Sequence, residues 1–231
     1  MSFKYQMADA ENNQSGVSTI GGPSVPMKGT VCLKTADVPS DPRVTDQWYL
    51  SEANILPVWN DYTGKGVSIA QFEPGSPFTD WLQVFDYRHP DLAPNVDPSW
   101  LADPDNPVPQ AFSDHATMVA GVMVAARNGE GGVGVAYGAT LSGVYLPDFG
   151  ALLSEVPSRL YQLKDYDVVN GSYNFPADLR FWNLTGDPDP HEQAAAFGRN
   201  YLGTVMVYAA GNERAKGGNT NDSNFTKSRW T

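Results

Sequence analysis

The sequence is poor in cysteine and in basic residues, and it contains no long apolar run. A single cysteine, Cys32, among 231 residues excludes a framework of intrachain disulfides. Only 15 Lys and Arg stand against 26 Asp and Glu, which gives a formal net charge of −11. Without a basic stripe to neutralise phosphates, we predict no nucleic-acid partner. Because no stretch of about 18 apolar residues occurs, we also predict no membrane span.

The first 40 residues differ in character from the rest of the chain. Phe3 and Tyr5 alternate with polar residues, and a polar turn at 11–14 separates them from a second short strand candidate. This pattern resembles the last two strands of Ig-like or cadherin-like repeats, so residues 1–21 are interpreted as the tail of an upstream repeat. Residues 22–40 are rich in Gly, Pro and Ser and are interpreted as a linker.

Strand and helix patterns alternate through the remainder of the chain. The predicted strands cover residues 67–72, 140–146, 166–171 and 204–210, and the predicted helices cover residues 113–127, 152–163 and 191–202. This alternation predicts a parallel sheet with helices on its faces. Because sites in such sheets lie at the carboxyl ends of strands, we expect Glu73, His115 and Asn212 to share one cleft.

A carboxylate, an imidazole and a side-chain amide in one cleft suit acyl-transfer chemistry. Glu73 would accept the Nδ1 proton of His115, His115 would take a proton from a nucleophile, and Asn212 would donate to the developing oxyanion. Each residue also has a structural interpretation. His115 is equally well a capping or exposed histidine, Glu73 a solvated strand end, and Asn212 a turn residue after glycine. Spacing alone leaves these alternatives open.

A series of short motifs adds to this pattern. In chain order they are Asp41-Pro42, Gln47-Trp48-Tyr49-Leu50, Tyr62-Thr63-Gly64-Lys65-Gly66-Val67, His89-Pro90-Asp91-Leu92-Ala93, Asp114-His115-Ala116-Thr117 with Ala120-Gly121, Gly132-Val133-Gly134-Val135-Ala136-Tyr137 and Tyr208-Ala209-Ala210-Gly211-Asn212. Together they resemble the subtilisin-like serine proteases, and most closely the kexin/furin branch. The resemblance extends from Asp41 to about Ser228. It implies an α/β three-layer sandwich with a mainly parallel sheet, and a polypeptide substrate.

The resemblance also implies roles for individual residues. His115 falls at the general base, Asn212 at the oxyanion donor, and Glu73 where the family has its catalytic aspartate. The strand edge that pairs with substrate falls on Ser172, Tyr173 and Asn174. One structural calcium site would use the side chains of Asp41, Asp91 and Asn128 and the carbonyls of Ala125, Glu130 and Gly132. The other interpretation of these acids is that they are solvated loop residues.

Four departures from the family pattern qualify these roles. Glu73 is one methylene longer than aspartate, and a shift of backbone or ring must absorb that length. Ala116 follows the histidine where the family has glycine. Pro74, Gly218 and Ser223 stand where the branch has acids, so we predict neither paired-basic cleavage nor a second calcium site. No Gly-Thr-Ser tripeptide occurs, so the chain alone is expected to be inactive.

Two hypotheses follow for residues 41–231. In the first, they are the N-terminal part of a subtilisin-like serine endopeptidase whose serine lies beyond the fragment. In the second, they form a non-catalytic, calcium-binding subtilisin-like module of a surface or adhesion protein. Glu73, Ala116 and Pro74 favour the second, whereas the end at Thr231, inside an expected strand, favours the first. The first residues show no signal peptide, so either the protein is cytoplasmic or these residues belong to a longer secreted chain. Of these two, we expect a location outside the cell or at its surface.

Overall fold

The computed structural model describes residues 38–74, 83–103, 111–146, 159–173, 189–209 and Asn212. The predicted N-terminal strands and most of the linker lie outside these ranges. So do the positions of three further sequence-based predictions, Asn174, Gly218 and Ser223.

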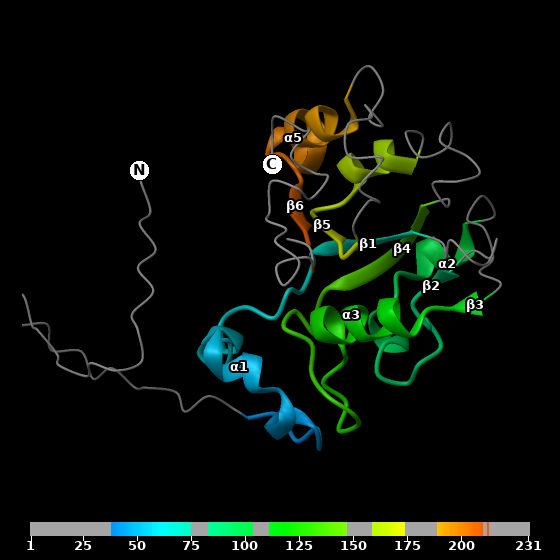
Figure 1. The fold of residues 1–231 in the computed structure, drawn as a ribbon. Coiled ribbons are helices and arrows are strands. Elements are labelled where there is room, and N and C mark those ends of the chain that lie inside the picture. Colours follow the sequence, from blue (N-terminus) through cyan, green and yellow to red (C-terminus); the bar gives the residue numbers. More distant parts are fainter. Residues whose placement is uncertain are drawn as a thin grey trace, which may run out of the picture. The chain divides into compact units, whose positions relative to one another are not determined.

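Within the described ranges, a four-stranded parallel sheet forms the centre of the fold (Figure 1). Its strands are β1 (Ser68–Pro74), β4 (Thr140–Leu146), β5 (Val168–Gly171) and β6 (Val205–Tyr208), in the order β4-β1-β5-β6. Ile69 pairs with Leu141 on one side and with Val168 on the other. The β-branched and apolar residues of these segments favour strands, and each of the pairs β1–β4, β1–β5 and β5–β6 is parallel. The predicted parallel sheet is therefore confirmed.

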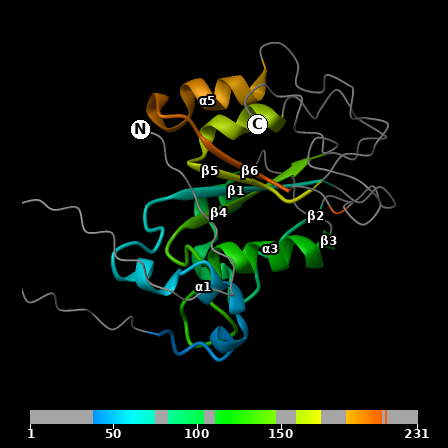
Figure 2. The same cartoon turned by 60° about the vertical axis from the view of Figure 1, so that its left-hand side comes forward.

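Helices cover both faces of the sheet, with α3 (Asp114–Val124) on one side and α5 (Pro190–Tyr201) on the other (Figures 1 and 2). The remaining elements are α1 (Trp48–Glu52), α2 (Pro98–Ala102), the short parallel pair β2 (Gln83–Val84) and β3 (Ala111–Phe112), and 3-10 turns at Val44–Asp46, Leu56–Asn60, Ala93–Asn95 and Tyr161–Asp165. This layering confirms the predicted α/β sandwich. Among the described residues, no helix has the length and apolar character needed to cross a membrane.

The alternation of side chains along β1 decides which residues face which helix. Ala70 and Phe72 pack into the core beneath α5, together with residues of the 159–165 segment. Ile69 packs into the opposite core with Ala116 and Ala120 of α3. Since side chains of a strand repeat every two residues, Gln71 and Glu73 lie on the same face as Ile69. Glu73 is thereby directed toward the start of α3.

Helix α3 is fixed at both ends by polar side chains. At its start, the Ser113 Oγ accepts a hydrogen bond from the Ala116 N–H at 3.1 Å, as an N-cap residue does. At its end, the Asn95 Nδ2 donates to the carbonyls of Val124 at 2.7 Å and Tyr137 at 2.8 Å. These contacts satisfy backbone groups that a helix end leaves unpaired. The helix that carries His115 is therefore held firmly against the sheet.

Apart from the strand 140–146, the predicted boundaries differ from the structure by one residue or more, and three segments illustrate this. The predicted helix 152–163 is described only from Arg159 onward, where Arg159 and Leu160 are helical and the 3-10 turn Tyr161–Asp165 follows. The predicted strand 166–171 begins only at Val168. Helix α5 begins at Pro190, as the Asp-Pro signal indicates, but Arg199 and Asn200 take left-handed backbone conformations (φ 51° and 53°). The ends of helices and strands vary by one or two residues with the way they are assigned, so a sequence pattern places an element more exactly than its ends.

Candidate active site

The carboxylate of Glu73 and the imidazole of His115 are in contact. The distance from His115 Nδ1 to Glu73 Oε1 is 3.0 Å. Glu73 is the last residue but one of β1, and His115 is the second residue of α3, so a strand end and a helix start supply the pair. The longer glutamate side chain spans the gap between these elements without loss of hydrogen-bonding distance.

The two members of the pair have different surroundings. The Glu73 side chain is 8% exposed and the His115 side chain 54% exposed. Burial raises the pKa of Glu73, while the hydrogen bond and the charge of His115 lower it, as does hydrogen bonding with Gln71 and Ser113. Among the described residues, the second carboxylate oxygen, Oε2, is buried and has no hydrogen-bond partner. The carboxylate is thus enclosed, and the imidazole faces outward.

This arrangement orients the imidazole for proton transfer. A carboxylate that accepts the Nδ1 proton fixes the tautomer, so Nε2 becomes the basic nitrogen of His115. Because the ring is half exposed, Nε2 is open to a nucleophile that approaches from outside. The capping role that was the alternative for His115 belongs instead to Ser113, which precedes α3.

The other predicted site residues lie at the same edge of the sheet. Asn212 is exposed and follows β6, four residues beyond Tyr208. Ser172 and Tyr173 follow β5, the neighbour of β1. The Ser172 Oγ donates to the Asn170 Oδ1 at 2.9 Å. Tyr173 is buried, and its ring packs edge-on against Tyr208 at 6.4 Å. The structure shows no contact of Asn212 with Glu73 or His115 among the described residues.

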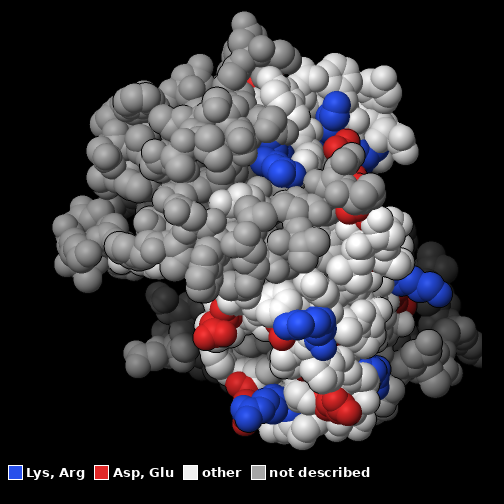
Figure 3. Space-filling model, turned by 90° about the vertical axis from the view of Figure 1, so that its right-hand side faces the viewer, with Lys and Arg blue, Asp and Glu red and all other residues white. Residues whose placement is uncertain are grey.

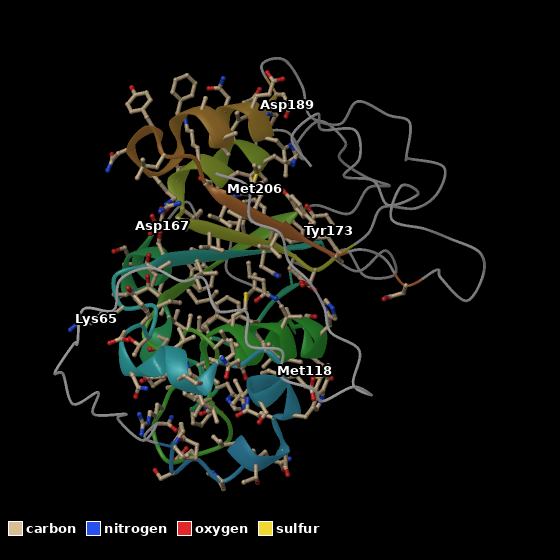
Figure 4. All side chains as sticks on the ribbon, turned by 90° about the vertical axis from the view of Figure 1, so that its left-hand side faces the viewer. Lys65, Met118, Asp167, Tyr173, Asp189 and Met206 are labelled. Carbon is tan, nitrogen blue, oxygen red and sulfur yellow. The ribbon has the colours of Figure 1, made fainter. Side chains whose placement is uncertain are left out.

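The structure contains a second carboxylate–histidine pair, which the sequence patterns did not predict. Asp189 caps α5, and its Oδ1 also lies 3.2 Å from His191 Nδ1. The other ring nitrogen, Nε2, lies 3.1 Å from the Tyr208 hydroxyl. Burial lowers the pKa of His191, and burial also raises the pKa of Tyr208. Asp189 lies on the side of the sheet opposite Met118 of α3 (Figure 4). The Asp-x-His spacing at a helix start was the one sequence signal for this pair.

Two buried carboxylates are held by the loop that follows α3. The Asp41 Oδ1 accepts from the N–H groups of Asn128 at 3.0 Å and Gly129 at 2.9 Å. The Asp91 Oδ2 accepts from the Gly132 N–H at 3.0 Å. In the described part of the chain, their remaining oxygens, Asp41 Oδ2 and Asp91 Oδ1, are buried without a hydrogen-bond partner.

The electrostatics of these two acids suit a cation between them. Burial raises the pKa of Asp91, and the negative charges of Asp41 and Glu130 raise it further. Buried like charges with unpartnered oxygens are costly unless a cation compensates them. Within the described residues no three His, Cys, Asp or Glu side chains gather to hold a metal, so further ligands would have to be carbonyl or amide oxygens. The residues present fit a hard, oxygen-seeking ion such as Ca²⁺.

The remaining predicted calcium ligands lie around the same loop. Ala125 follows the last residue of α3, and its carbonyl accepts from the Gly134 N–H at 2.8 Å. The Asn128 Oδ1 accepts from the Glu130 N–H at 2.9 Å. Asn128 and Glu130 are exposed, and Gly132 is half-buried.

On one face of the molecule, acidic and basic side chains are interspersed over the described surface (Figure 3).

Comparisons with known proteins show the family and the fold of this chain. Residues 65–229 match the model of the subtilase family, Peptidase_S8. The chain is 32% identical to furin of Bos taurus over 84% of its own length, and 32% identical to a PC3-like endoprotease of Hydra vulgaris over 86%. It spans 25% and 30% of the length of these two relatives. The Aeromonas sobria serine protease, solved with its chaperone, aligns with a TM-score of 0.52 over 75% of this chain and 32% of that one, at 23% identity.

Proposed function

Because the chain belongs to the subtilase family of serine proteases, we propose that residues 41–231 are the N-terminal part of the catalytic domain of a serine endopeptidase, which cleaves polypeptides through a Glu-His-Ser triad. The observation that carries the proposal is the 3.0 Å contact between Glu73 Oε1 and Nδ1 of His115, whose side chain is half exposed. In this proposal His115 is the general base, Glu73 orients it, and Asn212 donates to the oxyanion.

The reaction would begin when His115 Nε2 takes the proton from a serine hydroxyl that attacks the peptide carbonyl. Glu73 would stabilise the imidazolium that forms, and the proton would then pass from Nε2 to the leaving amine. The substrate would pair with the chain at Ser172, Tyr173 and the following Asn174. The sequence has no Gly-Thr-Ser tripeptide, and the 231-residue chain by itself is expected to show no turnover.

The test uses the full-length gene product and a fluorophosphonate probe, which labels only activated serines. We expect covalent labelling of the wild type and none of His115→Ala. Circular dichroism of both proteins shows whether they are folded. A folded wild-type protein that takes no label would overturn the proposal and support the second hypothesis, a non-catalytic surface or adhesion module.

We also propose one structural calcium ion, held by Asp41, Asp91 and Asn128 with the carbonyls of Ala125, Glu130 and Gly132. The unpartnered, buried oxygens Asp41 Oδ2 and Asp91 Oδ1 support it. Such a site suits an extracellular or cell-surface location, where calcium is abundant enough to fill sites with dissociation constants of about 10⁻⁴ to 10⁻³ M.

Chelation tests the calcium site independently of activity. A chelator should lower the melting temperature of the wild type, because a ligand that binds only the folded state stabilises it. Asp91→Asn should abolish this shift and raise the melting temperature of the metal-free protein, since the repulsion from Asp41 is relieved. Asp61→Asn, an exposed loop acid, is the matched control and should keep the shift. An unchanged wild-type transition on chelation would exclude the site.

A further inference from the structure

Gln71 stands between the two elements that form the candidate active site. It is 1% exposed and lies on β1, two residues before Glu73 and on the same face of the sheet. Its Nε2 donates to the Ala116 carbonyl at 3.0 Å, and Ala116 is the residue that follows His115. A buried side chain of one catalytic element is therefore attached to the other, next to both members of the pair.

The chemistry of the amide suits this place. An amide NH₂ carries two donors, so while one N–H serves the Ala116 carbonyl, the other remains available to the Glu73 carboxylate, two residues along on the same face of β1. Hydrogen bonding with Gln71 lowers the pKa of Glu73. The amide thus contacts the helix that carries the histidine and also favours the ionised form of the carboxylate that the histidine needs.

A role in stability alone does not explain this residue. The Gln71 Oε1 is buried and has no hydrogen-bond partner among the described residues. An unpartnered buried carbonyl costs about 1–3 kcal/mol, and Gln71 lies on the face of β1 whose residue Ile69 packs into an apolar core with Ala116 and Ala120. A methionine of similar shape would remove that cost. The amide is thus unfavourable for packing, and its benefit lies in the hydrogen bond from Nε2 to the Ala116 carbonyl.

We propose that Gln71 is a positioning residue of the active site, which fixes the first turn of α3 against β1 so that His115 Nδ1 and Glu73 Oε1 stay within hydrogen-bonding distance. This inference rests on the proposed function for its catalytic meaning. The dependence of the Glu73–His115 contact on Gln71 is a structural claim, and it can be tested without any enzyme activity.

A matched control exists at the other end of the same helix. Asn95 also donates a side-chain amide to a carbonyl of α3, that of Val124, at 2.7 Å. Asn95→Leu removes an amide tether from α3 far from His115, whereas Gln71→Met removes the tether beside it. If tethers act only by holding the helix, both substitutions should affect His115 alike.

The experiment uses the full-length protein with ¹⁵N-labelled histidine. The readout is the downfield proton resonance of His115 Nδ1, assigned by its loss in His115→Ala. We expect Gln71→Met to shift or broaden this resonance while the melting temperature is unchanged or higher, and Asn95→Leu to leave the resonance in place. In the same proteins, kcat should fall about 10- to 100-fold in Gln71→Met with KM unchanged, and Asn95→Leu should keep the wild-type kcat.

Each result decides the question. A wild-type His115 resonance in Gln71→Met would overturn the proposal whatever the melting temperature does. An equal change of the resonance in Asn95→Leu would also overturn it, because helix anchoring would then suffice as the cause. If the proposed function is wrong, no variant and no wild type turns over substrate, yet the resonance still reports on Gln71.

Discussion

The two carboxylate–histidine pairs of this chain have similar contacts and opposite environments. In each, a ring Nδ1 lies close to a carboxylate oxygen, at 3.0 Å for His115 and Glu73 and at 3.2 Å for His191 and Asp189. The His115 side chain is 54% exposed, whereas that of His191 is 7% exposed. The two also differ in their surroundings, because Nε2 of His191 lies 3.1 Å from the Tyr208 hydroxyl, whereas the half-exposed ring of His115 faces outward.

This comparison shows that a histidine oriented by a carboxylate is not sufficient for catalysis. A general base needs a ring nitrogen that a substrate or nucleophile can reach. His191 has both nitrogens occupied inside the core, where it joins α5 to β6. His115 has one nitrogen occupied and one available, at the carboxyl edge of the sheet. The same pair of side chains therefore serves structure in one place and is fitted for proton transfer in the other.

The largest expected difference between the pairs concerns turnover. In the full-length protein, His115→Gln should reduce kcat by about 10⁶-fold, because the general base is lost. His191→Gln should change kcat by less than about tenfold, since its ring takes no part in the proposed reaction. Peptide hydrolysis by both variants measures this. Equal losses in the two variants would contradict the distinction drawn between them.

Substitution of the two carboxylates should also affect kcat unequally, with a smaller loss at the catalytic pair than substitution of its histidine causes. Glu73→Gln keeps the size of the side chain but no longer fixes the tautomer of His115, and we expect kcat to fall by about 10⁴-fold. Asp189→Asn should leave kcat near the wild-type value and lower the melting temperature. Steady-state kinetics and thermal melts of both variants test this. A wild-type kcat in Glu73→Gln would remove Glu73 from the catalytic role.

The buried pair should make the protein sensitive to acid. Because burial lowers the pKa of His191 in the folded state, the unfolded chain binds the proton more readily than the folded one. Stability is then complete above the unfolded pKa of about 6.5 and falls as the pH drops below it. Melting temperatures of wild type and His191→Gln between about pH 5 and pH 8 measure the effect. The variant should show a flatter profile, and parallel profiles would refute the assignment.

The smallest expected effects concern the helix caps beside the two histidines. Ser113→Ala removes the acceptor for the Ala116 N–H and should cost about 1 kcal/mol of stability. Asp189→Ala removes the corresponding cap of α5, whose Oδ1 accepts from the His191 N–H at 2.9 Å, and also leaves the His191 Nδ1 without its carboxylate. It should therefore destabilise more than Ser113→Ala does. Chemical denaturation of the two variants ranks them.

Much of the fold could be predicted because its signals are local. Alternating strands and helices indicated the parallel sheet, and the Asp-Pro pair located the start of α5. The proximity of Glu73 and His115 followed from one rule, that strand ends and the helices after them meet at one edge. The role of Gln71 could not be predicted, because a glutamine inside an apolar strand gives no sign of which carbonyl lies 3.0 Å from it. Nor does the sequence reveal that Tyr208 reaches His191 across the α5 side of the sheet.

The hydrogen bond from Gln71 of β1 to the Ala116 carbonyl of α3 also affects which substitutions this site could accept during evolution. A shift from Glu73 to the aspartate typical of the family would shorten the side chain by one methylene and draw the carboxylate away from His115. Gln71 holds the strand and the helix at their present separation, so that step would be harmful while the glutamine remains. Loss of the amide first would allow the helix to approach. Positions 71 and 73 are therefore epistatic, and the order of substitution decides whether a lineage can move between the two acids.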